Sequence, residues 1–382
     1  TGRQRSTEGG EHAGGSDALW IERRDIPLPE GGTWKAATRS AVREYRNFYY
    51  THCPAGIENV AVHTAISYEK DGVALMTYAV GRSEEEPARR ANAVCFDSSM
   101  TCRYWGTYIG GQSLDVPYEM TVDNGGTIYL TGTTQSVNFP ASAGAFQSTM
   151  QGTSDIFVAA FSASGQRLWA TYYGGTLGET SFGICKNGNQ VVVCGGANSL
   201  DFPISSGSRS GTPDAFLIAF NTAGARLWAF LYGGSDEDAF RAVTTDAQLN
   251  IVVTGYTNST DFPVTPPCAQ QTFGGDLDAV LVKLTQVGSI IWSTYWGGDI
   301  YEQPECVVCD ASGNIFAGGR THSSNFPTSV SCFQSFKSGA QDGFVVKMSP
   351  AGAMLWSTYL GGTSWDWVDR MAVAGTGDLY IS

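Results

Sequence analysis

Apolar residues along the chain come in short runs separated by clusters of Gly, Asn, Asp and Ser. The stretch before Gly362 shows this pattern most plainly, with runs at Cys306–Asp310, Asn314–Gly319, Asp342–Met348 and Leu355–Leu360. Short runs rich in β-branched and aromatic residues and bounded by turn residues are typical of β-strands. The pattern predicts an all-β chain built from units of four strands.

The last run of each unit ends in a recurring phrase, which reads Trp-Ser-Thr-Tyr-Leu-Gly-Gly at Trp356–Gly362. Related phrases occur at intervals of 64, 59, 64 and 64 residues, beginning at Trp105, Trp169, Trp228, Trp292 and Trp356. A regular period of this size indicates repeated supersecondary units that bury their apolar faces against one another. Four strands per unit is the organisation of a β-propeller blade. We label the strands a to d from the hub outward, so the phrase lies in strand d.

Turn residues support this strand order. Asn and Gly occur in the turns between strands a and b, where a tight hairpin requires a positive φ. The turns between strands c and d carry a glycine at matching places, at Gly165, Gly224, Gly288 and Gly352. Both features predict antiparallel hairpins within each unit.

Three further phrases, Thr254–Thr257, Asp261–Pro263 and Asp278–Lys283, recur in the units together with the tryptophan phrase. Together they resemble the SBBP-type β-propeller repeat. The resemblance is strong over Trp105–Ser382 and faint over Glu58–Tyr104. It implies a propeller fold in secreted or cell-surface proteins, mostly bacterial, and it implies no settled activity.

The final unit contains strands a and b only, near Met371–Val373 and Asp378–Ser382, and an open blade would leave a bare sheet edge. The phrase Ser16–Glu22 resembles the strand c phrase Ser154–Ala160. We therefore expect six blades, with the last one closed by strands from both termini and Ala18–Glu22 paired with Leu379–Ser382. Seven blades is the alternative if the chain is a fragment.

The expected domain organisation follows from this count. Residues 1–15 are Gly-rich and polar, which predicts a disordered lead. One propeller domain then covers 16–382, with closing strands and a short helical insert in 16–58. The helix is expected at Trp34–Glu44 and a strand at Asn47–Thr51. The blades are expected at 59–111, 112–175, 176–234, 235–298 and 299–362, with the first half of the sixth at 363–382.

Composition narrows the classes of partner. The chain has 382 residues and a net charge of -13, which repels a nucleic-acid backbone. No apolar run approaches the roughly 18 residues that span a bilayer. Nine cysteines are too few for a disulfide scaffold, but Cys95 and Cys102 flank an expected hairpin turn and are the best candidates for a bridge. Such a bridge would indicate an oxidising compartment.

An acidic residue follows each Gly-Gly pair by four positions, in the loop between strands d and a. These loops open on one face of a propeller, so the carboxylates are expected to form a ring that could hold a cation. The alternative is that each carboxylate accepts hydrogen bonds from the backbone of its glycine turn, which would explain its presence in every unit. The residues are Asp115, Glu179, Asp238, Glu302 and Asp366.

A site acts at one place, so functional residues should break the repeat. Candidates for ligand or partner contact are Trp365, Asp366 and Trp367 in the last of these loops, with Tyr301 and Glu302 in the one before. The alternative is that they cover the seam where the blades close. Asn258 begins an N-glycosylation sequon.

The sequence contains no metalloprotease helix, phosphate-binding loop or nucleophile elbow. Cys306 and Cys309 have zinc-like spacing, but on a strand they would point to opposite faces. We therefore assign no catalytic residue, metal or cofactor.

The sequence favours a non-catalytic structural or protein-binding scaffold that contacts other proteins or copies of itself. The expected location is extracellular or at the cell surface, or in an organellar complex after removal of a targeting peptide. Two alternatives remain open: a glycan-binding propeller that uses the aromatic residues of these loops, and a glycan lyase or hydrolase.

Overall fold

The computed structural model describes residues 103–206 and 209–382, with five strand segments before them: Asp25–Pro27, Thr33–Lys35, Tyr68–Lys70, Val73–Ala79 and Ala91–Asp97. Side chains are described from Thr107 onward. All assigned elements in this part of the chain are strands, as the pattern of apolar runs predicts. Among these residues no helix has the length and apolar character that crossing a bilayer requires.

Five antiparallel sheets of four strands follow one another along the chain, and each sheet keeps its strands in sequence order. The first holds β3 (Tyr68–Lys70), β4 (Val73–Ala79), β5 (Ala91–Asp97) and β6 (Arg103–Ile109). The second holds β7 (Asp115–Val122), β8 (Ile128–Thr134), β9 (Asp155–Phe161) and β10 (Arg167–Tyr173). The third holds β11 (Glu179–Asn187), β12 (Gln190–Ala197), β13 (Asp214–Asn221) and β14 (Arg226–Tyr232).

The fourth sheet holds β15 (Asp238–Thr245), β16 (Ile251–Thr257), β17 (Asp278–Leu284) and β18 (Ile290–Trp296). The fifth holds β19 (Glu302–Cys309), β20 (Ile315–Thr321), β21 (Asp342–Met348) and β22 (Met354–Leu360). A sixth, two-stranded sheet pairs β23 (Met371–Val373) with β24 (Leu379–Ile381). Near the N-terminus β1 (Asp25–Pro27) pairs with β2 (Thr33–Lys35).

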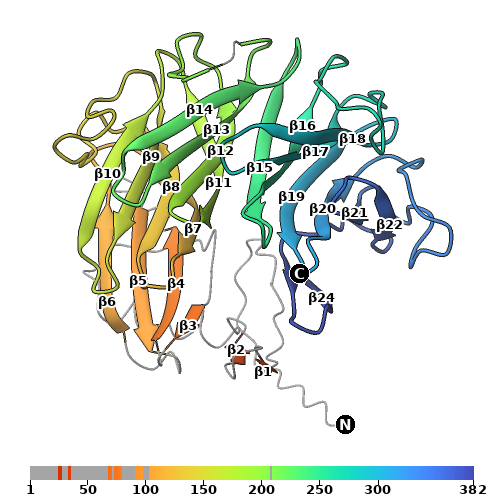
Figure 1. The fold of residues 1–382 in the computed structure, drawn as a ribbon, viewed down its shortest axis with the longest axis horizontal. Coiled ribbons are helices and arrows are strands. Elements are labelled where there is room, and N and C mark those ends of the chain that lie inside the picture. Colours follow the sequence, from red (N-terminus) through yellow and green to blue (C-terminus); the bar gives the residue numbers. More distant parts are fainter. Residues whose placement is uncertain are drawn as a thin grey trace, which may run out of the picture.

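The sheets are arranged as the blades of a fan around one centre (Figure 1). The first strands of successive sheets, β7, β11, β15, β19 and β23, contact one another in that order. The fourth strands, β10, β14, β18 and β22, lie at the opposite edge of each sheet. Four-stranded antiparallel sheets packed face to face around a shared hub form a β-propeller. The expected order of strands a to d from the hub outward is therefore confirmed.

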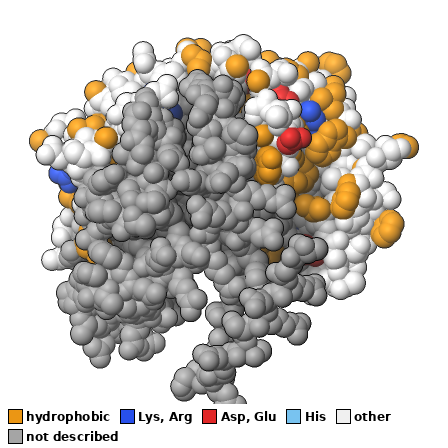
Figure 2. Space-filling model, turned by 90° about the horizontal axis from the view of Figure 1, so that it is seen from below, with side chains coloured by type: hydrophobic (Ala, Val, Ile, Leu, Met, Phe, Trp, Pro, Cys, Tyr) orange, Lys and Arg blue, Asp and Glu red, His pale blue; other side chains and the backbone are white. Residues whose placement is uncertain are grey.

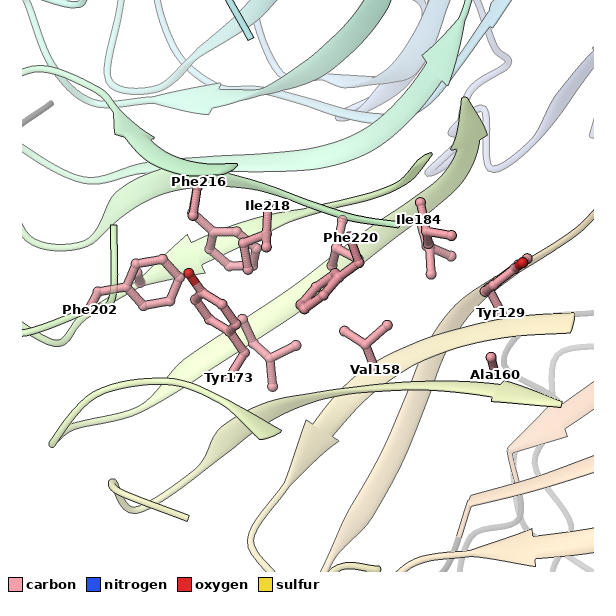
Figure 3. Close-up of a cluster of buried hydrophobic side chains, with 14 of the residues drawn as sticks. Tyr129, Val158, Ala160, Tyr173, Ile184, Phe202, Phe216, Ile218 and Phe220 are labelled. Atoms are coloured by element: carbon pink, nitrogen blue, oxygen red, sulfur yellow. The ribbon is translucent and has the colours of Figure 1, made fainter. Parts of the chain in front are cut away.

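Apolar side chains fill the space between successive sheets. Between the second and third sheets Val158 and Tyr173 meet Ile184, Phe216 and Phe220 in one cluster (Figure 3). Similar clusters follow between the later sheets, each drawing residues from two neighbours. Because no sheet can bury both faces alone, the sheets stabilise one another in series.

The tryptophan phrase links neighbouring blades. The Trp169 indole Nε1 donates to the Thr222 carbonyl, 2.9 Å away in the c-to-d turn of the next sheet. Trp292 Nε1 donates in the same way to the Pro350 carbonyl at 3.1 Å. The glycine that follows each carbonyl has a positive φ, as expected, with 87° at Gly224. The phrase is therefore framework in these blades.

Two expectations concern the ends of the chain: a helix over Trp34–Glu44 and a closing strand at Ala18–Glu22. Trp34 and Lys35 lie in β2, so the expected helix over Trp34–Glu44 does not begin at Trp34. A strand is fixed by the neighbour with which it pairs, which composition alone does not reveal. The residues expected to close the last blade, Ala18–Glu22, lie outside the described residues, as do 36–67. Within the described chain β24 pairs with β23 only.

Candidate functional site

Each of the five acidic residues after a Gly-Gly pair accepts a hydrogen bond from the backbone N–H of the second glycine. The distances are 2.8, 3.1, 2.7, 2.7 and 2.7 Å for Asp115, Glu179, Asp238, Glu302 and Asp366. We call these residues the turn acids. Four of them are fully buried at the start of an inner strand, and Asp366 is half-buried.

Hydroxyl groups of the same blade also bind the turn acids. Thr134 donates to Asp115 at 2.5 Å and Thr321 donates to Glu302 at 2.5 Å. Ser259 donates to Asp238 at 3.0 Å. A carboxylate that accepts several such bonds holds its own loop in shape. The geometry is that of the framework alternative, since each acid is directed to its own turn, and no group of His, Cys, Asp and Glu suited to a metal occurs among the described residues.

The aromatic candidates of the last two loops are joined by a histidine that lies between them. The His322 ring packs edge-on against Tyr301, with centroids 5.4 Å apart, and against Trp365, with centroids 6.1 Å apart. His322 Nε2 also lies 3.0 Å from Oε1 of Gln341. We call Tyr301, His322 and Trp365 the aromatic cluster. It spans the fifth sheet and the loop that leads into the sixth.

Trp365 and Trp367 are exposed to 63% and 53%, although both are large apolar side chains. Backbone pairing holds this loop in place, because Trp365 forms a parallel bridge with Gln341 and Asp366 N donates to the Gln341 carbonyl at 3.1 Å. The indoles therefore stand on a fixed loop rather than folding into the core. Glu302 is buried beneath the cluster as a turn acid and Asp366 binds the Gly362 amide.

A second group of unusual side chains lies at the hub. Inner strands β7, β11, β15 and β19 each contain a β-bulge at the third residue after the turn acid, where the pairing with strand b skips a residue. A bulge re-aims the side chain of the extra residue. The bulged positions, with their equivalent in the last blade, line one cavity of about 360 Å³: Tyr118, Phe182, Arg241, Glu305 and Asp369.

Contacts run from strand to strand around this hub cavity. The Tyr118 and Phe182 rings meet edge-on at 5.8 Å, and the Arg241 guanidinium lies 4.4 Å from the Phe182 ring centroid. Arg241 Nη2 donates to Glu305 Oε2 at 2.5 Å. Arg370 Nη2 lies 3.2 Å from Glu119 Oε2 and joins β7 to the last sheet. Burial raises the pKa of Glu119, and the Arg370 charge opposes this shift.

A polar chain links the hub to the aromatic cluster. The Tyr301 hydroxyl donates to Gln303 Oε1, which also accepts a hydrogen bond from Arg320 at 2.6 Å. Arg320 Nη2 lies 3.9 Å from Glu305 Oε1. The two groups of unusual residues therefore share partners on β19 and β20.

The other candidate residues, which are the cysteines and Asn258, make contacts within the blades. Cys306 packs in the cluster beside the sixth sheet and Cys309 against the cluster beside the fourth, so the two face opposite ways as expected. Burial raises the pKa of both thiols to about 12. Asn258 Nδ2, the atom that a glycan would modify, donates to the Asp276 carbonyl at 2.9 Å. Cys95 lies in β5 opposite Trp105, and Cys102 lies outside the described residues.

The sequence analysis missed both His322 and the hub cavity, for different reasons. His322 is brought to Trp365 by contacts between blades, and its position in the sequence does not predict this. The hub residues did leave a signal, because the position three residues after each turn acid holds a different side chain in every unit. Only the bulge turns this variation into one site, since it aims these side chains at a common centre.

No family model matches the chain. An uncharacterized WD repeat-containing protein of Acanthamoeba polyphaga mimivirus is 23% identical over 274 residues, which cover 56% of this chain and 20% of that protein. The chain thus spans about a fifth of the length of this relative. WD repeats are one of the sequence repeats that form propeller blades, in agreement with the fold.

Several solved structures share weaker likenesses. Hydrazine synthase of Kuenenia stuttgartiensis has a TM-score of 0.43 at 10% identity, covering 81% of this chain and 80% of that one. The quinohemoprotein alcohol dehydrogenase of Comamonas testosteroni has a TM-score of 0.40 at 12% identity, covering 92% and 58%. A putative gluconolactonase has a TM-score of 0.39 at 11% identity, covering 86% and 90%. At these scores and identities the likenesses say nothing about activity.

Proposed function

We propose that this propeller is a non-catalytic protein-binding scaffold, and that it contacts a partner protein through the aromatic cluster and Trp367. The observation that carries the proposal is the exposure of two neighbouring indoles, Trp365 and Trp367, on a loop held by backbone bonds. Exposed tryptophans on a rigid base supply large contact area at little cost in conformational entropy. The repeat does not require them, since other blades carry smaller residues there.

Apolar residues of a neighbouring loop extend this surface. The loop between β20 and β21 exposes Val330, Phe333 and Phe336 to 98%, 82% and 68%. Lys337 of the same loop donates to the His322 carbonyl, which ties the loop to the aromatic cluster. Seen from below, part of the surface gathers hydrophobic side chains around a few acidic and basic ones (Figure 2). Apolar groups rimmed by polar ones are typical of protein-binding surfaces.

The proposal gives the aromatic cluster no catalytic role. It is supported by the contact of the His322 imidazole, whose Nε2 lies 3.0 Å from the amide oxygen of Gln341. We assign no catalytic residue and no cofactor to the chain.

Photo-crosslinking tests the protein-binding function. A benzophenone amino acid replaces Trp367, which keeps an aromatic group at the position, and the matched control carries it at Leu200, exposed to 77% on another blade. We expect a cross-linked protein partner at position 367 and at least tenfold less product at position 200. Adding Trp365→Ala should reduce the yield at 367 about tenfold or more, as loss of a binding hot spot does.

Equal yields at the two positions, or a yield that Trp365→Ala leaves unchanged, would contradict the protein-binding function. Mass spectrometry of mixed light and heavy isotope-labelled protein identifies whether the partner is a second copy of this chain.

A second candidate function is glycan binding, favoured because both tryptophans are exposed on either side of Asp366, whose side chain is only half-buried. Sugar rings stack on indoles while polar groups bind their hydroxyls. Titration of oligosaccharides against tryptophan fluorescence distinguishes the two functions. A saturable change that disappears in Trp365→Ala and persists in Trp228→Phe would support glycan binding.

We further propose six blades, with the sixth completed by Ala18–Glu22 beside β24. The support is that β24 pairs with β23 only in the described chain, which leaves an edge for another strand. A disulfide between Leu19→Cys and Tyr380→Cys in the full chain should form under mild oxidation and appear in a peptide map. Its absence, with cysteine at 19 pairing elsewhere, would count against six blades.

The closer assignment to SBBP-type repeats and an extracellular or cell-surface location belong to the same proposal. They are supported by the tryptophan phrase and by the candidate bridge between Cys95 and Cys102. Mass measurement with and without reduction before alkylation would detect that bridge, and a free pair of thiols would remove this support.

A further inference from the structure

The charged residues around the hub cavity divide into two groups of opposite sign. Arg241 of β15 and Glu305 of β19 line the cavity and lie 2.5 Å apart, and Arg320 of β20, which lies outside the lining, is 3.9 Å from Glu305. Two arginines and one carboxylate give this side a formal excess of one positive charge. Arg241 has a single carboxylate partner among the described residues.

The reverse holds on the side formed by β7 and the segment that enters β23. There Arg370 lies between two carboxylates, 3.2 Å from Glu119 and 4.0 Å from Asp369. One arginine and two carboxylates give a formal excess of one negative charge. The Asp369 side chain is exposed to 61% and its contact with Arg370 is at the limit of an ion pair, so it keeps most of its capacity to accept hydrogen bonds.

The other described residues of the lining are apolar or aromatic, apart from one glycine. Tyr118 and Phe182 form one side of the cavity, and Met120, Ile184 and Val243 lie among the other lining residues. The volume of about 360 Å³ is at the small end of the range of roughly 300–1,000 Å³ that ligand pockets cover. A cavity of this size admits a small molecule and no folded partner.

Tyr118, Phe182, Arg241, Glu305 and Asp369 come from the bulged position, which holds a different residue in each of these blades, and Glu119 and Arg370 come from the next position, which also varies from blade to blade. Framework positions repeat because every blade needs them, as the turn acids do. Contact between blades alone would be met by any apolar residue at the bulge, whereas the cavity collects arginines and carboxylates. The Arg241 and Glu305 side chains are 23% and 15% exposed and so lose hydration energy there, while Asp369 stays largely solvated. A ligand carrying both charges would add charge-assisted hydrogen bonds on both sides of the cavity.

We propose that the hub cavity binds a free α-amino acid with an apolar side chain, with its carboxylate at Arg241 and its ammonium group at Asp369 and Glu119. The planar guanidinium of Arg241 offers paired donors suited to a carboxylate. The apolar side chain would lie against the aromatic side of the cavity. The site is separate from the aromatic cluster and does not depend on its function.

Calorimetric titration of the full chain with three matched probes tests the site. L-Leucine carries both charges, L-leucinamide lacks the carboxylate, and N-acetyl-L-leucine lacks the ammonium group. We expect L-leucine to bind and each analogue to bind at least tenfold more weakly, because each loses one set of charge-assisted hydrogen bonds. Equal affinity for the three probes, or no binding of L-leucine at millimolar concentration, would overturn the proposal.

Two variants test separately where the carboxylate and the ammonium group of the ligand bind. Arg241→Gln should weaken L-leucine at least tenfold while leaving L-leucinamide unchanged, and Asp369→Asn should weaken L-leucine while leaving N-acetyl-L-leucine unchanged. Arg167→Gln and Asp236→Asn, at exposed positions outside the cavity, are the matched controls. Asp369 is exposed, so its variant keeps the fold even if Arg241→Gln does not.

A variant that weakens all three probes equally would contradict the assigned orientation and overturn the proposal. The photo-crosslinking at Trp367 is independent of this result, so failure of the hub site and failure of the protein-binding function are distinguishable.

Discussion

Buried carboxylates are the most consistent feature of this chain at the scale of single residues. Burial raises the pKa of Asp238 to about 7, against the hydrogen bonds from Thr257, Gly234 and Ser259 that lower it. Burial also raises the pKa of Asp278 to about 7. An exposed acid behaves in the opposite way, since bonds from Ser235 lower the pKa of Asp261. The same residue type therefore titrates differently according to its depth in the blade.

Asp238 makes the stability of the propeller depend on pH. Its folded pKa of about 7 exceeds its ordinary value of 3.8, so between these values the folded state holds a proton that the unfolded state has lost. Raising the pH through this window removes stability, on the order of 2 kcal/mol between pH 5 and pH 7. Asp278 adds a slope of the same sign, since its pKa is also raised to about 7. Urea unfolding at several pH values should show the combined slope, and Asp238→Asn should remove the part that belongs to Asp238, on the order of 2 kcal/mol.

Asp261→Asn is the control for this measurement. Its pKa is lowered from the ordinary value of 3.8, so the variant should leave the slope between pH 5 and pH 7 unchanged. A slope of wild-type size in Asp238→Asn would show that other groups carry the proton.

At the scale of elements, the turn between strands c and d joins each blade to the one before it. The turn after β13 brings Gly224, with φ of 87°, against the Trp169 indole of the second sheet. A Cβ at Gly224 would lie 2.7 Å from Trp169 Cδ2. Glycine is therefore required twice at this position, by the left-handed backbone and by the contact.

Gly224→Ala should destabilise the protein by about 2–4 kcal/mol, of which about 1–2 kcal/mol is the cost of the left-handed conformation. The matched control is Gly144→Ala, where φ is 76° and no atom lies within 4 Å of the added carbon. Calorimetric melting of both variants separates the two contributions. Equal losses would mean that the Trp169 indole moves aside freely.

At the scale of the whole molecule, the blades are held in series and also across the hub. The ion pair of Arg370 with Glu119 joins residues 251 positions apart, from the last sheet to the second. The pair of Arg241 with Glu305 joins two neighbouring sheets and is better shielded from solvent. The first contact crosses the hub between the second sheet and the segment that enters the last one, and the second joins the fourth and fifth sheets.

Double-mutant cycles from urea unfolding should measure this difference. We expect a coupling of about 0.5 kcal/mol for Arg370 with Glu119, because Arg370 is 44% exposed and solvent weakens the pair. We expect about 1–2 kcal/mol for Arg241 with Glu305, where Phe182 also contacts the guanidinium. A larger coupling for the exposed pair would indicate that the contact between the second and last sheets contributes more to stability than the contact between the fourth and fifth sheets.

Features of the local sequence predicted the strands and turns within each blade. Alternating runs and turn glycines predicted the four strands, and the spacing of tryptophans predicted the units, because these features serve contacts within one blade or with the next. The hydrogen bonds of the turn acids could be anticipated because all units carry them. Trp34 was misassigned because pairing within β1–β2 overrides its helical surroundings.

The strands, turns and seam contacts of a blade follow from local sequence, because they depend on residues close in the chain or one repeat away. Which exceptional residues lie together depends on how the blades pack against one another. His322 meets Trp365 because two blades place their loops side by side, and Arg370 meets Glu119 because the sheets curve around one hub. Such contacts depend on the angle between blades, which no spacing in the sequence encodes.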